Sequence, residues 1–201
     1  MSAPVPGDGG GSPPPAGPQP TLRTARLVLR PFRAGDAPDV ERLAGAREVA
    51  DTTLNIPHPY PPGDAARWIA GHAAAWTAGT GAPFAICRAD DGALVGAIGL
   101  AVTQQHRRAE LGYWIGVPYW GRGYATEAGR AMLALAFERL GLHRVQAHYM
   151  TRNPASGRVM EKLGMRHEGL RRGAFRKGDR FEDVEEYAIL AGDWRAARDG
   201  G

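Results

Sequence analysis

Short runs rich in apolar residues, some of them alternating with polar ones, predict seven β-strands along the chain. They lie at residues 26–31, 84–88, 94–100, 110–115, 144–150, 167–172 and 183–190. The Asp-Asp-Gly sequence at 90–92 predicts an antiparallel hairpin between the second and third runs. In the fourth run, Glu110, Gly112 and Trp114 share one face of the strand, because successive side chains point to opposite sides.

Apolar residues at spacings of three and four predict helices between these strands. The expected helix starts are Asp36, Asp64, Thr126 and Asn153. At Asn153-Pro154 the asparagine is a favoured cap and the proline suits the first turn. The helix at 126–140 is apolar on most of its surface and should be buried. The order of strand, two helices, three strands, helix, strand, helix and two strands predicts one mixed α/β domain.

Proline and glycine dominate residues 1–20, where Asp8 carries the only charge. Such a segment buries too little apolar surface to offset the entropy lost on ordering. We therefore expect a disordered tail at 1–20, one domain at 21–196 and a short flexible C-terminus at 197–201. A proline-rich ligand for a partner domain is the alternative to a plain spacer.

The net charge and the cysteine content exclude few classes of function. The formal net charge is +4 and the pI is about 9.6, which favours an anionic ligand or simply a solvated basic surface. Cys87, the single cysteine, lies in an apolar run and is expected in the core rather than as a nucleophile. Six scattered histidines suggest no metal site. Without a membrane-spanning run or a signal pattern, we expect a cytoplasmic protein with no membrane partner.

The most informative segment is residues 119–128, Tyr-Trp-Gly-Arg-Gly-Tyr-Ala-Thr-Glu-Ala, which follows a predicted strand and opens the buried helix. Its glycines let backbone N–H groups approach a ligand closely, and the start of a helix attracts an anion such as phosphate. The segment is neither a Walker A loop nor a dinucleotide fingerprint. A pyrophosphate on another carrier is therefore favoured.

These residues resemble the acetyl-CoA loop of the GNAT superfamily of N-acetyltransferases, in the branch that contains the ribosomal-protein acetylases RimJ and RimL. Matching segments occur in the same order at 22–30, 110–115 and 153–164. Trp120 departs from the superfamily pattern, which usually has Gln or Arg three residues before the glycine that matches Gly123. Other residues are common there in this branch, so we expect CoA binding to be retained.

The resemblance implies a GNAT fold, which is an α/β fold with a mostly antiparallel central sheet and a splayed parallel strand pair flanked by helices. The splayed pair would be the strands at 110–115 and 144–150, with the pantetheine arm between them. Acetyl-CoA would be the cosubstrate, and no metal is implied. The implied cofactor-binding residues are Ile115, Gly116, Val117, Arg122, Gly123, Tyr124, Ala125, Thr126, Asn153 and Ser156.

Glu110 is the candidate base that deprotonates the amine through a water molecule, with a solvated strand-end charge as its alternative. Ser156 matches a position near the CoA sulfur and would donate a hydrogen bond to the departing thiolate, unless it serves only the first helical turn. Glu127 is a weaker base candidate, because a helix start gives it a structural role. Candidates for the acceptor pocket, with core packing as the alternative, are Tyr60, Trp68, Trp114 and His148.

The resemblance implies direct acetyl transfer from acetyl-CoA to a primary amine, with a protein N-terminus of the ribosomal-protein kind as the expected acceptor. A polyamine or an aminoglycoside stays open as the acceptor, because one fold serves many substrates. A non-catalytic acyl-CoA sensor is a second class of function. A nucleotide-binding protein is a third, disfavoured because the loop lacks a suitably placed lysine.

Basic residues gather at 166–180 and could meet the CoA 3′-phosphate or an acidic partner, or form a solvated hairpin face. No RNA-binding motif is present, so we expect no specific nucleic acid partner. Dimers are common among the proteins that the chain resembles, and a homodimer is therefore an expectation that comes with the resemblance.

Overall fold

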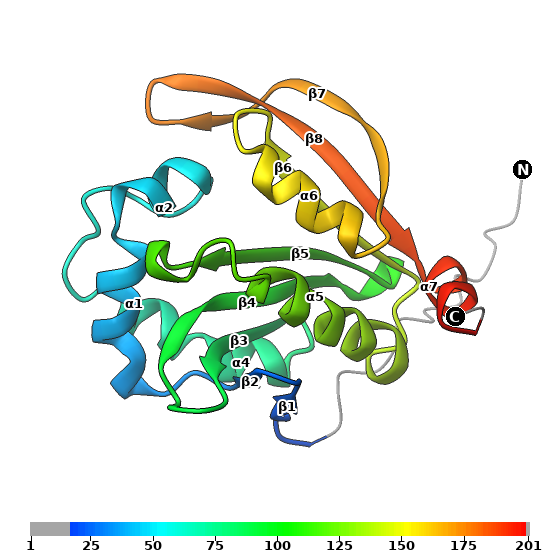
Figure 1. Ribbon diagram of the computed structural model, residues 1–201, viewed down its shortest axis with the longest axis horizontal. Coiled ribbons are helices and arrows are strands. Elements are labelled where there is room, and N and C mark those ends of the chain that lie inside the picture. Colours follow the sequence, from blue (N-terminus) through cyan, green and yellow to red (C-terminus); the bar gives the residue numbers. More distant parts are fainter. Residues whose placement is uncertain (1–16, 200–201) are drawn as a thin grey trace, which may run out of the picture.

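A computed structural model describes residues 17–199, so most of the tail expected at 1–20 lies outside the described residues. These residues form one eight-stranded sheet with helices packed against it (Figure 1). The strands are β1 (Leu22–Arg23), β2 (Leu27–Arg30), β3 (Gly81–Arg88), β4 (Leu94–Thr103), β5 (Arg108–Ile115), β6 (Arg144–Met150), β7 (Arg166–Lys177) and β8 (Arg180–Leu190). All seven predicted strands are confirmed, several of them longer than expected.

The main helices are α1 (Ala37–Ala44), α2 (Arg47–Thr52), α3 (Asp64–Ala70), α4 (His72–Thr77), α5 (Tyr124–Ala134), α6 (Pro154–Lys162) and α7 (Ala191–Asp199). A π-helical turn at Leu135–Arg139 continues α5. The second predicted helix is in fact two, because the chain turns at Gly71 between α3 and α4. Helix α7 had no clear signal in the sequence and extends into the range expected as a flexible C-terminus.

The predicted cap at Asp64 is wrong, and the predicted helix start at Asp36 is confirmed. Asp64 is the first residue of α3, and the cap is Gly63, whose φ of +80° suits glycine. Asp36 does precede α1, but its carboxylate accepts hydrogen bonds from the Arg30 guanidinium and from the backbone N–H of Arg33. An ion pair therefore competes successfully with capping at this position.

The sheet order is β1-β2-β3-β4-β5-β6-β8-β7, and every neighbouring pair is antiparallel except β5 and β6. The β3–β4 hairpin forms as predicted. The parallel pair is joined at only three positions, the last of which is Glu110 opposite Gln146. Beyond that point β5 stays on β4 and β6 stays on β8. The predicted splayed parallel pair in a mostly antiparallel sheet is therefore confirmed.

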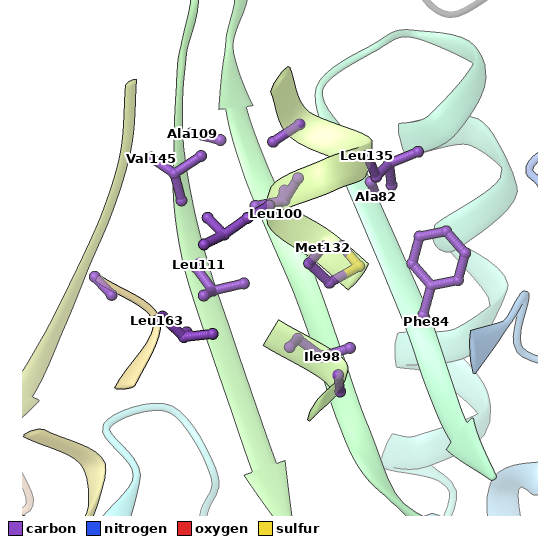
Figure 2. Close-up of a cluster of buried hydrophobic side chains, with 14 of the residues drawn as sticks. Ala82, Phe84, Ile98, Leu100, Ala109, Leu111, Met132, Leu135, Val145 and Leu163 are labelled. Atoms are coloured by element: carbon purple, nitrogen blue, oxygen red, sulfur yellow. The ribbon is translucent and has the colours of Figure 1, made fainter. Parts of the chain in front are cut away.

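Apolar clusters cover both faces of the sheet. On one face, Met132 of α5 packs against Ile98, Leu100 and Leu111 of the central strands (Figure 2). On the opposite face, α1 and α3 cover a smaller cluster that includes Cys87. Burial raises the pKa of the Cys87 thiol, in line with the predicted core role. Within the described part of the chain, no helix has the length and apolarity that a membrane span requires.

Candidate active site

The gap between β5 and β6 belongs to a cavity of about 950 Å³, a size typical of small-molecule sites. On one face of the sheet, the starts of α5 and α6 line the cavity. On the opposite face, residues 52–56 and Trp68 of α3 line it. A ligand in the splayed gap can therefore meet a second molecule that approaches from the other side of the sheet.

The start of α5 offers backbone donors to this cavity. Gly121 and Gly123 adopt φ values of +71° and +79°, in the left-handed region that favours glycine. The first N–H that bonds within the helix belongs to Glu127, which donates to Gly123 O at 3.0 Å. The N–H groups of the residues between them, Tyr124, Ala125 and Thr126, precede this bond and face a cavity that these residues line. Together with the helix dipole they form a suitable site for a pyrophosphate.

Glu127 joins the start of α5 to the turn between β1 and β2. One carboxylate oxygen accepts hydrogen bonds from Thr24 Oγ1 at 2.6 Å and from the Arg26 backbone N–H at 2.8 Å. The other accepts a hydrogen bond from Arg26 Nε at 2.7 Å. Burial alone would raise the pKa of Glu127, but these bonds and the Arg26 charge lower it. Glu127 does not line the cavity, and its contacts support the structural role expected of it.

Two cations that the sequence reasoning missed lie at the cavity. Arg158 and Lys162 are four residues apart on α6 and both line it. The sequence could have indicated this pair, because residues four positions apart on a predicted helix lie on the same face. The basic segment at 166–180, for which contact with the 3′-phosphate and a solvated hairpin face were the alternatives, lies on the β7–β8 hairpin, where several of its cations pair with acidic residues. These pairs are Arg171–Glu186, Arg176–Asp179 and Arg180–Glu182.

Ser156 stands in the first turn of α6 and contacts Tyr113 of β5. The two hydroxyl oxygens are 2.7 Å apart, and Tyr113 Oη is also 3.2 Å from the backbone oxygen of Ser156. Burial raises the pKa of Tyr113 to about 12, so this phenol stays protonated at neutral pH. When Tyr113 donates to Ser156 Oγ, the Ser156 proton is free to point into the cavity. The sequence placed Tyr113 on the strand without indicating this contact.

Asn153 occupies the cap position of α6 but makes no side-chain capping bond, which corrects the predicted cap. Its Nδ2 donates instead to the backbone oxygen of Thr52, at 3.2 Å. The partner is 101 residues away in sequence, which is why the local pattern suggested a cap. The contact joins the start of α6 to the end of α2 at the cavity wall.

Glu110 lies where β5 and β6 separate, and its side chain is 45% exposed. Its Oε1 is 3.6 Å from Nδ1 of His148, which lies two residues after Gln146 on β6. The His148 ring stacks on Phe175 of β7, with centroids 4.8 Å apart and planes at 16°. All three residues line the cavity. The arrangement places a carboxylate within reach of a water molecule or an amine at the gap.

The structure brings most of the predicted site residues together. Those that line the cavity are Glu110, Trp68, Trp114, His148, Ile115, Gly123, Tyr124, Ala125, Thr126, Asn153 and Ser156. Gly116, Val117 and Arg122 do not line it, and the Arg122 guanidinium lies 6.0 Å from the Tyr119 ring centroid. Tyr60 does not reach it either, because it packs against the cluster of α1 and α3.

Comparison with known proteins agrees with this geometry. Residues 26–166 match the family model described as an acetyltransferase (GNAT) domain. The chain is 34% identical over 173 residues to the uncharacterized N-acetyltransferase YoaA of Bacillus subtilis, covering 85% of this chain and 97% of that protein. It is 35% identical over 109 residues to the putative ribosomal N-acetyltransferase YdaF of Bacillus subtilis, covering 54% of this chain and 60% of the relative.

A solved structure is similar to this chain in fold. Mycobacterium smegmatis RimJ, in complex with CoA-disulfide, matches with a TM-score of 0.72 and 26% identity. The match covers 86% of this chain and 89% of that chain.

Proposed function

The chain belongs to the acetyltransferase (GNAT) family, and from this premise we propose that it transfers the acetyl group of acetyl-CoA to the N-terminal amine of a protein or peptide. The observation that carries the proposal is a single cavity that joins the backbone donors at the start of α5 to an apolar groove on the other side of the sheet. Its N-acetyltransferase relatives support the reaction, and YdaF supports a ribosomal kind of acceptor.

The cavity fits CoA in charge and in shape. The pyrophosphate would accept hydrogen bonds from the backbone N–H groups of residues 124–126. Arg158 and Lys162 supply positive charge on α6 for the phosphates. The splayed β5 and β6 leave strand backbone that can pair with the amides of the pantetheine arm. Acetyl-CoA would supply the reactive thioester in this gap.

Glu110 would accept the proton that the amine must lose before it attacks, directly or through one water molecule. His148, 3.6 Å from the carboxylate, would hold that carboxylate in place. The exposed setting of Glu110 allows the proton to pass on to solvent.

Ser156 would donate a hydrogen bond to the sulfur as the thiolate leaves, while Tyr113 donates a hydrogen bond to Ser156 Oγ. A donor aimed at the position where negative charge develops lowers the barrier, because the charge is met by a group already in place. Holding the amine beside the thioester contributes further, since it removes the entropy cost of bringing the two together.

The choice of acceptor rests on the charges in the cavity. Among the described residues that line it, Glu110 is the single acidic side chain, whereas Arg158 and Lys162 are cationic. A polyamine or an aminoglycoside carries several positive charges and would need several carboxylates to bind well. A peptide N-terminus presents one amine and neutral backbone, which suits this lining better.

Release of free CoA thiol tests the proposal directly. Acetyl-CoA is offered with N-terminal peptides, spermidine or an aminoglycoside, each at the same concentration. Thiol release that depends on peptide, at a rate well above the rates with the polycations, is expected. Faster release with spermidine or the aminoglycoside would replace the acceptor by a small amine. CoA binding without release on any amine would favour the sensor alternative.

A further inference from the structure

A row of small residues crosses the sheet on the face opposite α5. The strand registers place Pro83 of β3 beside Gly99 of β4, and Gly99 beside Gly112 of β5. All three line the cavity, as do the neighbouring Ala97 and Ala101. A Cβ added at Gly112 would meet no heavy atom within 4 Å. The row is therefore the floor of a groove that is open at its Gly112 end.

Two aromatic side chains stand at the far end of this floor. In the antiparallel β2–β3 pair, Arg30 lies beside Ala85. Two residues further along, Phe32 therefore comes close to Pro83, and both residues line the cavity. The Phe32 and Trp68 rings are in T-shaped contact, with centroids 5.0 Å apart, and Trp68 is 40% exposed. The groove thus ends at an exposed apolar surface.

His72 packs edge-on against the indole of Trp68. Their ring centroids are 4.3 Å apart at 87°. Burial lowers the pKa of His72 to about 4, so the ring is neutral at pH 7 and packs as an apolar group. Contacts with Phe32 and His72 therefore hold the Trp68 ring in place, while the residue remains 40% exposed.

The opposite wall of the groove, residues 52–56, is also fixed. Lys177 of β7 donates to the backbone oxygens of Thr53 at 2.5 Å, Ile56 at 3.3 Å and Leu54 at 3.4 Å. Asn153 holds Thr52 in the same way. Two elements outside the wall thus fix its backbone, so the groove is formed before an acceptor arrives, which lowers the entropy cost of binding.

The length of the floor matches a short stretch of peptide. Strands are spaced by about 4.8 Å, so the distance from Gly112 to the Phe32 end is on the order of 14 Å. An extended chain advances by roughly 3.3 Å per residue, which corresponds to about four residues. The reacting amine at the Gly112 end would lie beside Glu110, on the same face of β5.

We infer that the floor at Pro83, Gly99 and Gly112 binds the first four residues of a peptide acceptor, and that Phe32 and Trp68 receive an apolar side chain among them. This inference rests on the proposed function and adds a selectivity to it. The enzyme prefers N-terminal sequences that carry Leu or Phe, rather than Ser or Asp, at the position that reaches the aromatic pair. The lack of a cation on this part of the floor gives an acidic side chain no partner.

A peptide series tests the selectivity. One parent peptide carries Leu, Phe, Ser or Asp in turn at positions two, three and four, and kcat/KM is measured for each. Wild-type enzyme should prefer Leu or Phe over Ser by about tenfold at one of these positions. Trp68→Ala should reduce that preference to about twofold or less, and Trp68→Phe should retain most of it. Phe181→Ala, at an aromatic residue that is 72% exposed and does not line the cavity, is the matched control and should change nothing.

Substitution of Gly112 tests the floor independently. Gly112→Ala, Gly112→Val and Gly112→Leu place growing side chains in open space on an extended strand, so the fold should be retained. We expect the KM for peptide to rise stepwise by about tenfold or more, with a much smaller change in acetyl-CoA affinity.

Peptide acetylation with equal rates for Leu, Ser and Asp at all three positions would overturn the groove assignment and leave the proposed function intact. So would an unchanged preference in folded Trp68→Ala. Acetylation of spermidine but of no peptide would instead contradict the proposed function itself.

Discussion

The hydroxyl oxygens of Tyr113 and Ser156 lie 2.7 Å apart, joining the middle of β5 to the first turn of α6 beside the splayed gap. Partial burial raises the pKa of Tyr113 to about 12, so the phenol can act as a donor across the neutral pH range. Ser156 lines the cavity. The pair would set the direction of the Ser156 proton without Tyr113 reaching the reacting atoms.

Tyr113→Phe removes the phenol while keeping the ring that packs beside Ser156. A lost hydrogen bond is worth about 1 kcal/mol, so kcat should fall roughly fivefold, with a small change in KM for acetyl-CoA. Ser156→Ala should lower kcat further. Steady-state kinetics of both single variants and of the double variant give the coupling, and we expect the double variant to match Ser156→Ala. Fully additive effects would show that Tyr113 acts independently of Ser156.

Glu110→Gln keeps the size of the side chain and removes its capacity to accept a proton. If Glu110 is the base, kcat should fall by about 10²-fold or more, and the limb of the pH–rate profile that reports the base should disappear. Affinity for CoA, measured by calorimetry, should stay close to wild type. Glu138→Gln is the matched control, because Glu138 pairs with Arg198 at the surface. A wild-type pH–rate profile in Glu110→Gln would remove this residue from the mechanism.

Gly123→Val should weaken CoA binding by at least tenfold. Gly123 has a φ of +79°, which costs a β-branched residue about 1–2 kcal/mol, and the added side chain would also stand beside the phosphate-binding N–H groups. Gly92→Val is the matched control, since Gly92 has a φ of +73° in the β3–β4 turn, outside the cavity. Calorimetric titration with CoA should separate the two variants. Equal CoA affinity in both would contradict the placement of the phosphates at α5.

Glu127→Gln should destabilise the fold in a pH-dependent way. The folded-state pKa of Glu127 is lowered, so its stabilising contribution is complete above the unfolded value of about 4.3 and is lost as the pH falls through the folded value. At pH 7 we expect the Tm of the variant to be about 4–8 °C below wild type, from the loss of about 2 kcal/mol in charged hydrogen bonds. The difference should shrink below pH 4. A Tm difference that stays constant from pH 7 to pH 3 would argue against this ionised anchor.

The strands and the glycine-rich turn before α5 could be predicted because their signals are local. The alternation of side chains along β5 determines which face carries Glu110. The glycines at 121 and 123 indicate a turn with left-handed backbone before α5. The resemblance then supplied the parallel pair and its splay, which no local pattern contains.

The contacts that shape the site could not be read in the same way. Asn153 and Thr52 are 101 residues apart, and Lys177 reaches the oxygen of a residue 124 positions earlier, so only the folded chain brings them together. Tyr60 was expected in the acceptor pocket but packs in the core. The local sequence could not distinguish the two, because an aromatic side chain in a loop can turn either way. Its contacts with α1 and α3 decide the matter.

The central claim is that the α-amine of a peptide is the acetyl acceptor. The most direct measurement uses two versions of one lysine-free peptide, identical except that one has its N-terminus formylated. Each is incubated with acetyl-CoA and enzyme, and the products are identified by mass spectrometry. Addition of one acetyl group to the free peptide and none to the blocked peptide is the predicted result. No acetylation of the free peptide, in a protein that binds CoA and acetylates spermidine or an aminoglycoside, would contradict the claim.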